Sequence, residues 1–419
     1  MYEHYQLKNK ANVLLVPLRD TKSVTVLIMY PVGSRYEPQK MNGVSHYIEH
    51  LMFKGTQKRK NTLTLTREID RLGAEYNAFT SKEYTGYYIK TDTEYTQTAL
   101  DILSDMLFHS TFDAKEMERE KGPIVEELRM YRDNPIMNIE TIFEGLLYQG
   151  SPLGWDIGGT PEHVVSYKRD EVLAYKHKYY QANNMTVVVA GNIQEETKGW
   201  IEKYFGSEKV EGVVNKKYKP YVFGSVKKND RLIVEQKPTD QAQLMLGFPG
   251  FPYQDKRNVT ASVLNTILGG SMSSRLFIQI RERRGLAYVI RSVVEQFRDT
   301  GYVAVRAGLE PKNINKAIHV IQQEIEKIKE KGVTKRELDD AKTHIRGALT
   351  LSLEDSSSQA DWYGRSFLFQ DKIYTPEERL ALIEAVTLDD IQKLARDTFR
   401  FSEMRVAVIG NIEKNKIQY

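Results

Sequence analysis

The chain has 419 residues, of which 41% are hydrophobic and 28% are charged, the composition of a folded globular protein. This length suits two domains of roughly 200 residues each better than a single core. The formal net charge of +4 is too small to indicate nucleic acid as the main partner. There are no cysteines, so disulfides, thiolate catalysis and cysteine-ligated zinc are excluded.

The apolar runs are short. None approaches the roughly 18 residues of a membrane span, and the longest are strand-like stretches such as 24–30. We therefore predict no membrane partner. The first residues carry neither the apolar core of a signal peptide nor an Arg- and Ser-rich transit segment, so a cytoplasmic location is expected.

In chain order, the two halves of the sequence predict the same elements. The first half has two strands (12–18 and 23–30), a helix (46–54), a long helix in FDAKEMEREKGPIVEEL (112–128) and a last strand in NNMTVVVAGNI (183–193). The second half repeats this order with strands 231–235 and 241–248, a helix 259–268, VTKRELDDAKTHIRGAL (333–349) and SEMRVAVIGNI (402–412). Such self-similarity indicates a duplicated fold.

Each repeat reads as strands, helix, hairpin strands, long helices and a final strand. This pattern predicts an α+β protein of two homologous domains, each a mainly antiparallel sheet with helices packed on one face. We place the domains at 1–210 and 231–419, joined by a linker at 211–230. The Lys-rich segment 209–231 reads as a solvated linker or, less favoured, as a docking patch; nucleic-acid binding through it has little further support.

The strongest local signal is an HxxEH motif in the helical stretch 44–53. His46 and His50 are one turn apart, so both imidazoles can reach one ion, and Glu49 lies beside that face. This order is the inverse of the HExxH motif of zinc peptidases. The alternative is an amphipathic helix that carries two polar histidines and a glutamate by chance.

A hydrolytic metal site needs a third protein ligand and an open position. In the helix 113–132, Glu120 and Glu127 are two turns apart and share a face, whereas Glu126 points about 100° away. Pro123 lies between them and is expected to kink the helix. His109, His177 and His344 lack a paired donor at ligand spacing and are expected to be unrelated to the metal.

The second repeat lacks all of these polar residues. The gap-free alignment of the long helices places Ala341 opposite Glu120 and Ala348 opposite Glu127. Thr260 and Leu264 stand where the first repeat has its two motif histidines. The joint loss predicts one catalytic and one non-catalytic domain.

Several segments together resemble the pitrilysin, or M16, family of inverzincin metallopeptidases, which includes insulin-degrading enzyme and the mitochondrial processing peptidase. The resemblance covers essentially the whole chain. It rests on GVSHYIEHLMFKGT (43–56), EREKGPIVEEL (118–128), NAFTSKEYTGYY (77–88) and GGSMSSRLFIQIRERRGLAYVI (269–290). It implies a fold of the LuxS/MPP-like metallohydrolase type.

The resemblance implies roles for the first-domain residues. His46, His50 and Glu127 would bind one Zn²⁺ per chain. Glu49 would be the general base that activates a zinc-bound water, and Glu120 would support the site from behind the ligands.

It also implies residues that bind substrate. An extended peptide would pair with the edge strand at Asn77, Ala78, Phe79 and Thr80. Arg281 and Tyr288 of the second domain would contact the substrate as charge develops. Without the resemblance, Tyr288 reads as an ordinary sheet aromatic and Arg281 as a solvated helix cation. The aromatics Tyr84, Tyr87 and Tyr88 are expected to serve strand packing.

The resulting prediction is a zinc-dependent metalloendopeptidase that hydrolyses extended or unfolded peptides. Family members that form a closed chamber use four such domains, so this two-domain chain is expected to form a homodimer. A heterodimer with a metal-less paralogue is the other possibility. The rival function is a non-catalytic peptide-binding or assembly subunit, which usually lacks the HxxEH motif.

Overall fold

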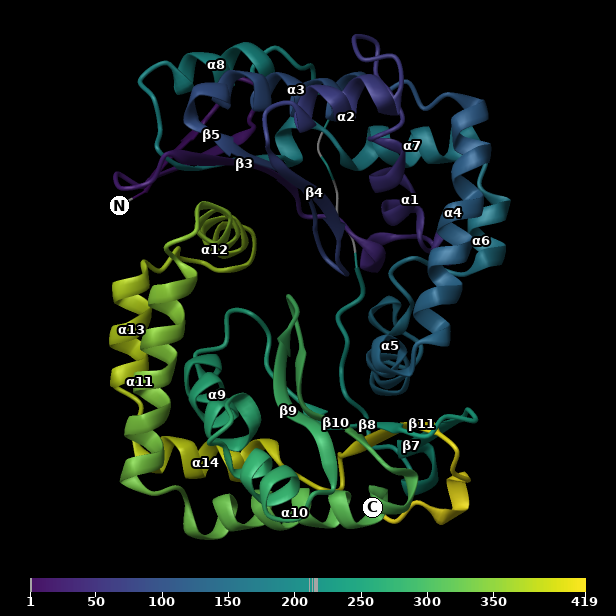
Figure 1. The fold of residues 1–419 in the computed structure, drawn as a ribbon, viewed down its shortest axis with the longest axis vertical. Helices are drawn as coiled ribbons and strands as arrows, with labels where there is room; N and C mark the ends of the chain where they lie inside the picture. Colours follow the sequence, from purple (N-terminus) through teal and green to yellow (C-terminus); the bar gives the residue numbers. More distant parts are fainter. Residues whose placement is uncertain (1, 211, 213, 215–217) are drawn as a thin grey trace. The chain divides into compact units, whose positions relative to one another are not determined.

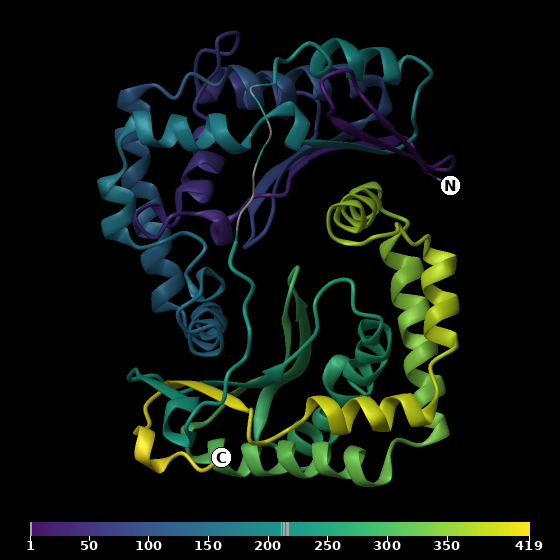
Figure 2. The same cartoon turned by 180° about the vertical axis from the view of Figure 1, so that it is seen from behind.

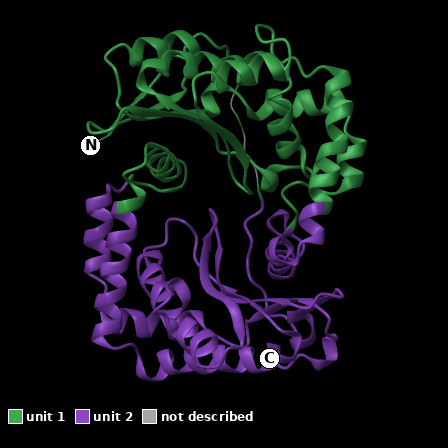
Figure 3. Ribbon diagram, in the orientation of Figure 1, with its two compact units in different colours: residues 1–129, 155–218, 351–373 green, residues 130–154, 219–350, 374–419 purple. Residues whose placement is uncertain are grey.

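The computed structural model describes all residues except 1, 211, 213 and 215–217. Figures 1 and 2 show the fold from opposite sides, and Figure 3 shows its two compact units. Unit 1 comprises Met1–Arg129, Trp155–Tyr218 and Leu351–Ile373, and unit 2 comprises Met130–Gly154, Lys219–Thr350 and Tyr374–Tyr419. Some residues of the predicted linker 211–230 lie outside the described residues.

Unit 1 is built on a six-stranded sheet. Its strands are β1 (Glu3–Gln6), β2 (Asn12–Pro17), β3 (Ser23–Tyr30), β4 (Glu75–Thr80), β5 (Thr85–Asp92) and β6 (Thr186–Gly191). The order is β1-β2-β6-β3-β5-β4, and only the β2–β6 pair is parallel. β4 is therefore an edge strand, and its outer backbone groups have no partner strand within the sheet.

Alternate residues of the unit 1 strands enter two separate hydrophobic clusters. Val13 and Leu15 of β2 belong to the larger one, whereas Leu14 and Val16 belong to a second cluster on the opposite face. Figures 1 and 2 show α3 and α8 on one side of this sheet and α12 on the other. The helices of unit 1 are α1 (Val44–Leu51), α2 (Thr62–Asp70), α3 (Thr96–His109), α4 (Ala114–Asp133, to Arg129 in this unit), α6 (Pro161–Ser166), α7 (Arg169–Tyr179), α8 (Thr197–Phe205), α12 (Ser356–Phe369) and the short η1 (Ser34–Tyr36), η2 (Gln39–Met41), η3 (Thr93–Tyr95) and η5 (Ala182–Asn184).

Unit 2 is built on a five-stranded sheet of the same design. Its strands are β7 (Leu232–Gln236), β8 (Ala242–Pro249), β9 (Ala287–Gln296), β10 (Gly301–Leu309) and β11 (Arg405–Gly410). The order is β7-β11-β8-β10-β9, with only β7–β11 parallel. Leu244 and Leu246 of β8 pack with the helices of one face, whereas Met245 between them packs against α5 on the other.

The helices of unit 2 again lie on both faces of its sheet. They are α5 (Pro135–Leu147), α9 (Arg257–Asn265), α10 (Ile314–Lys331), α11 (Lys335–Ser352, to Thr350 in this unit), α13 (Pro376–Glu384), α14 (Leu388–Thr398), the π-helical η7 (Thr266–Gly270) and η8 (Phe277–Glu282), and the short η4 (Pro152–Gly154), η6 (Lys228–Arg231), η9 (Pro311–Asn313) and η10 (Lys414–Lys416).

The two sequence halves exchange one helix. α5 follows the long helix of the first half but packs on β8 and β11 of unit 2, and α12 follows the matching helix of the second half but packs on β3 and β6 of unit 1 (Figure 3). The predicted fold class of two α+β domains with mainly antiparallel sheets is confirmed. Helices were predicted on one face of each sheet, but the exchanged helices cover the second face as well, which the periodicity of one half alone does not reveal. The boundaries 1–210 and 231–419 stay a prediction.

Among the described residues, no helix combines the length and the apolar character that crossing a membrane requires.

Candidate metal centre

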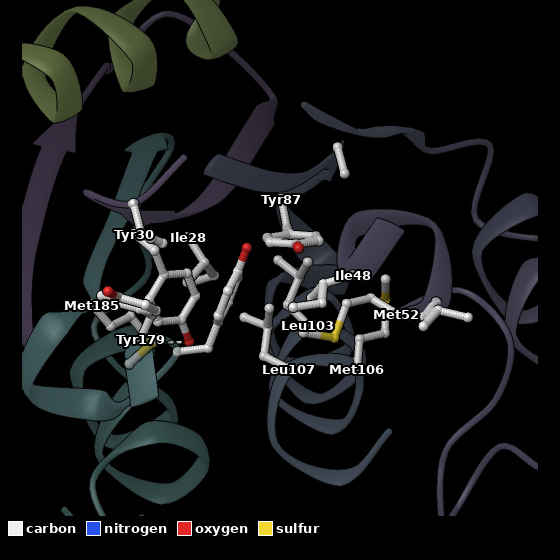
Figure 4. Close-up of a cluster of buried hydrophobic side chains, with 14 of the residues drawn as sticks. Ile28, Tyr30, Ile48, Met52, Tyr87, Leu103, Met106, Leu107, Tyr179 and Met185 are labelled. Carbon is white, nitrogen blue, oxygen red and sulfur yellow. Dashed lines mark hydrogen bonds between the residues drawn. The ribbon is translucent and has the colours of Figure 1, made fainter. Parts of the chain in front are cut away.

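The HxxEH motif lies on α1, a short amphipathic helix. Val44, Tyr47, Ile48 and Leu51 are all buried, and their spacing of three, four and seven residues forms one stripe. Figure 4 shows Ile48 and Met52 of this segment among the side chains of Leu103, Met106 and Leu107 of α3. This packing anchors one face of α1 and leaves the motif residues on another.

A buried carboxylate fixes the start of α1. Gly43, the residue before the helix, has φ 98° and supplies no capping side chain. Glu37 caps the helix instead. One of its carboxylate oxygens accepts a hydrogen bond from the backbone N–H of Gly43 (2.6 Å), and the other accepts one from the backbone N–H of Ser45 (2.8 Å). Burial raises the pKa of Glu37 despite these hydrogen bonds. A Cβ on Gly43 would lie 2.2 Å from the Gly158 carbonyl oxygen, so only glycine fits there.

The third predicted ligand lies on α4, which runs from Ala114 to Asp133 with Pro123 inside it. The Tyr47 hydroxyl donates to the Met117 carbonyl (2.6 Å) and ties α1 to this helix. Glu120 and Glu127 both contact His50, so the two glutamates share a face of α4 as their spacing predicts.

His46, His50 and Glu127 offer one ligand atom each, and these atoms lie within 4.8 Å of one another. Glu127 Oε2 is 3.3 Å from His50 Nε2 and 3.7 Å from His46 Nε2. Tetrahedral zinc with bonds of ~2.0–2.1 Å needs ligand atoms about 3.3 Å apart, so the three residues fit a zinc ion. All three are partly exposed, which leaves room for an open coordination position. His109, His177 and His344 are not part of this group.

The two histidines have opposite electrostatic surroundings. Burial, reinforced by the neighbouring His50, lowers the pKa of His46 to about 4, so this imidazole is neutral as a metal ligand must be. Burial also lowers the pKa of His50, but hydrogen bonds to Glu120 and Glu127 outweigh it and raise the value to about 9. His46 Nδ1 is buried and has no hydrogen-bond partner among the described residues.

Glu120 orients His50 rather than joining the ligand group. Its Oε1 lies 3.0 Å from His50 Nδ1, which turns Nε2 toward Glu127. Its Oε2 lies 2.5 Å from Lys54 Nζ. Burial raises the pKa of Glu120, but the hydrogen bonds from His50 and Lys54 outweigh it and hold the carboxyl ionised.

Glu49 lies beside the ligand group and is held by the edge strand. The hydroxyl of Thr80, the last residue of β4, donates to Glu49 Oε2 (2.6 Å). Burial raises the pKa of Glu49, and the Thr80 hydrogen bond opposes that shift. Tyr76 and Ala78 face the core that contains α1, whereas Phe79 faces the cluster beneath α12. The predicted strand 77–80 therefore ends at the HxxEH helix.

The predicted aromatics of the neighbouring strand pack as expected. Tyr87 is fully buried in the larger core cluster, and Tyr84 and Tyr88 pack against the cluster beneath α12.

Arg281 and Tyr288 meet in unit 2. The Arg281 guanidinium lies 5.3 Å from the centre of the Tyr288 ring and 4.8 Å from that of Phe277. Tyr288, in the edge strand β9, is 72% exposed, so it is not a packed sheet aromatic. The pair presents a phenol and a guanidinium together on the surface of this unit.

Sequence reasoning missed two residues that shape the centre, Lys54 and Glu37, and it missed the side-chain role of Thr80. Lys54 follows His50 by one helical turn, and that spacing could have revealed it. Thr80 was expected to act through its backbone, yet its side chain holds Glu49. Glu37 reaches α1 from a loop, and no periodicity connects them.

The family model described as Insulinase (Peptidase family M16) matches residues 12–160, and that described as Peptidase M16 inactive domain matches residues 166–345. A Bacillus subtilis protein named "Uncharacterized zinc protease YmxG" is 36% identical over 399 residues, covering 95% of this chain and 96% of the relative.

Two solved structures share the fold. A Helicobacter pylori structure titled as a protease has a TM-score of 0.89 at 24% identity, covering 98% of this chain and 99% of its own. A chain in "Complex III2 from Candida albicans, Inz-5 bound" has a TM-score of 0.84 at 17% identity, covering 99% and 97%. At these identities the likeness concerns the fold alone.

Proposed function

Because the chain belongs to peptidase family M16, we propose that it is a zinc-dependent metalloendopeptidase that cleaves extended or unfolded peptides. The observation that carries the proposal is the convergence of His46, His50 and Glu127 within 4.8 Å, with Glu49 on the adjoining face of α1. The first three residues would hold one Zn²⁺ per chain, and Glu49 would serve as the base.

Each residue of the centre would have a separate role in the reaction. Zinc, when bound, polarises the scissile carbonyl and lowers the pKa of water in the site. Glu49 accepts the proton of the attacking water and later passes it to the leaving amine. Its raised pKa suits a group that must both take up and release a proton. Glu120 keeps the His50 imidazole oriented, and Thr80 keeps Glu49 in place.

The substrate would bind as an added strand on β4. β4 pairs only with β5 in its sheet, so its outer N–H and C=O groups can pair with an extended peptide. A peptide along Asn77, Ala78, Phe79 and Thr80 would pass beside Glu49, because Thr80 contacts that carboxylate. Backbone pairing of this kind favours unfolded substrates and gives loose side-chain selectivity.

Arg281 and Tyr288 would contact the substrate from a second protomer in a homodimer. The exposure of Tyr288, its contact with the half-buried Arg281, and the presence of both in the chain that also carries the metal group support this arrangement. A heterodimer with a metal-less paralogue is the alternative. Light scattering tests the claim: a stable monomer with undiminished activity would contradict the dimer.

The rival function is a non-catalytic binding or assembly subunit. The family model described as an inactive domain matches residues 166–345, which do not include the HxxEH segment. That segment lies in the part matched by the Insulinase model, residues 12–160. The intact ligand group in unit 1 favours the peptidase.

The deciding experiment measures cleavage of a quenched fluorescent peptide, with zinc content determined by elemental analysis. Glu49→Gln should lower kcat by about 10²–10⁴-fold while zinc stays bound, because the base is lost and the ligands are kept. Glu126→Gln is the matched control, since Glu126 is exposed and pairs with Arg129. Undiminished activity of Glu49→Gln, or of protein freed of metal by a chelator, would refute the mechanism.

A further inference from the structure

We propose that unit 2 carries a second binding site, for a small phosphate-bearing anion, in a hollow between α10 and the start of β11. The hollow has a volume of about 560 Å³, within the range of small-molecule sites. Its lining is rich in cations and amides: Lys228, Arg231, His319, Gln322, Gln323, Glu326 and Lys329, with Phe401, Ser402, Met404 and Tyr419.

Two arginines stand side by side at this edge of the sheet. β7 and β11 are parallel strands, and Leu232 pairs with Val406. Arg231 and Arg405 each precede one of these paired residues, so the two arginines are neighbours. Arg405 is only 4% exposed. Burial, and then the nearby positive charge of Arg231, lowers the pKa of Arg405. Adjacent like charges destabilise a sheet unless another group compensates them.

No carboxylate of the described residues forms an ion pair with either arginine. Arg231 donates to the Phe401 carbonyl (2.7 Å) and Arg405 to the Glu403 carbonyl (2.7 Å), while the Glu403 carboxylate pairs with Arg400. Arg231 Nε is buried and has no acceptor among the described residues. Arg405 lies behind the described lining of the hollow, whereas Arg231 is half-buried within it, so an anion in the hollow would pair with Arg231 directly.

The remaining cations add to the positive field of the hollow. The Lys228 ammonium lies 5.5 Å from the centre of the Tyr419 ring, and the Lys329 ammonium lies 4.8 Å from that of Phe401. Among the described lining residues, Glu326 is the only Asp or Glu, and it pairs with Lys329 at 2.7 Å. Lys228 and Arg231 therefore remain as cations without an acidic partner among the described lining residues.

The chemistry favours phosphate over a single carboxylate. Two or more cations and the unused Arg231 N–H can be satisfied together only by a group with several charged oxygens, which forms several charge-assisted hydrogen bonds at once. Lys228 and Arg231 belong to the Lys-rich segment 209–231, so part of that segment would bind a ligand rather than merely contact solvent. The hollow belongs to unit 2, whereas the candidate metal group belongs to unit 1.

The test is calorimetric titration of the full-length, zinc-loaded protein with inorganic pyrophosphate. Arg231→Gln should weaken binding at least tenfold, and Lys228→Gln at least threefold. Lys228 is exposed, so its variant keeps the test valid if Arg231→Gln does not fold. Arg336→Gln is the matched control: this residue of α11 has a side chain 90% exposed and should change binding less than twofold.

Zinc is a competing target for pyrophosphate, so the titration is repeated on a variant without the proposed ligands His50 and Glu127. Unchanged binding in that variant supports the site in unit 2. The proposal is overturned if the native protein shows no pyrophosphate binding, or if Arg231→Gln and Lys228→Gln bind as the native protein does. It is also overturned if an oligonucleotide binds through these residues and pyrophosphate does not.

Discussion

The two units contain corresponding helices that differ in the side chains of one face, which include candidate metal-ligand residues in unit 1 but not in unit 2. In unit 1, α1 presents two partly exposed histidines that meet Glu127 of α4. In unit 2, the sequence alignment places Leu264 of α9 opposite His50, and Leu264 is 3% exposed within the core. Ala341 of α11, opposite Glu120, is 4% exposed in the same core. At these two positions unit 2 buries apolar side chains where unit 1 keeps polar ones, whereas Thr260 is half-buried and Ala348 is exposed.

This difference shows that the fold does not require the polar group. Apart from β1, which has no counterpart among the described strands of unit 2, the two sheets have the same strand order and the same single parallel pair, although unit 2 has Thr260, Leu264, Ala341 and Ala348 at these places. Half-buried His and Glu side chains carry a desolvation cost that Thr, Leu and Ala at the matching places do not, so their presence in unit 1 points to function.

The largest effect is expected when unit 1 receives the residues of unit 2. His46→Thr, His50→Leu and Glu127→Ala together should reduce bound zinc from about one per chain to near zero. Cleavage should fall on the order of 10³-fold or more, because the metal supplies several kcal/mol of transition-state stabilisation. Elemental analysis and the peptide assay measure both. His177→Leu, on an exposed residue of α7, should leave zinc and activity unchanged.

The next largest effect is expected when unit 2 loses the hydroxyl group of Tyr288. Tyr288→Phe should lower kcat/KM by about 10²-fold if the exposed phenol donates to the developing charge, with zinc content unchanged. Tyr131→Phe is the control, since Tyr131 is a 41% exposed tyrosine of the same unit. Equal kinetics for the two variants would reduce Tyr288 to a surface aromatic.

A smaller effect is expected at the start of the HxxEH helix. In the native protein, each of the two Glu37 carboxylate oxygens accepts a hydrogen bond from a backbone N–H. In Glu37→Gln one of these oxygens is replaced by an NH2 group, which would face an N–H donor. Zinc affinity should fall about tenfold, as for other groups that orient ligands, with a loss of about 1–3 kcal/mol in stability. Competition with a chromogenic chelator measures the affinity. Asp255→Asn, at the start of α9, provides the comparison and should leave zinc affinity unchanged.

The smallest effect concerns the exchanged helices. α5 is anchored in unit 2 by buried Phe143, whereas α12 is capped by the preceding residue, Asp355, which pairs with Lys90 of β5 at 2.6 Å. Burial raises the pKa of Asp355, but hydrogen bonds from Lys90 and Ser357 outweigh it and bring the value to about 2.

Asp355→Asn should therefore cost about 1 kcal/mol or less at pH 7, since the pair is partly exposed. Because the pKa of Asp355 is lower in the folded protein than in the unfolded chain, its ionised carboxylate stabilises the fold at pH values above the unfolded pKa. The destabilisation caused by Asp355→Asn should therefore vanish as the pH falls from about 4 to about 2. Urea unfolding at several pH values measures this. A cost independent of pH would show that the charge of Asp355 does not hold α12.

Much of the centre follows from local spacing. Two histidines one turn apart, and two glutamates two turns apart, must share helix faces because the α-helix repeats every 3.6 residues. The duplicated strand and helix pattern likewise predicted two α+β domains, since each half repeats the same periodicities. These inferences need no knowledge of distant contacts.

Other features depend on residues far apart in the sequence. Thr80 reaches Glu49 only because β4 ends beside α1, and Glu37 reaches the start of α1 only because its loop is buried there. Periodicity also cannot tell which sheet a helix covers, so the exchange of α5 and α12 was not predicted.

The amino-acid sequence by itself determined which residue types occupy one helix face, and hence the His-His-Glu group and its absence from the second repeat. The tertiary structure alone decided what surrounds that group and how the hydrophobic residues, 41% of the chain, are divided between the two units. The physical reason is that helical and strand periods act over a few residues, whereas desolvation and hydrogen bonding depend on packing between segments that can be hundreds of residues apart.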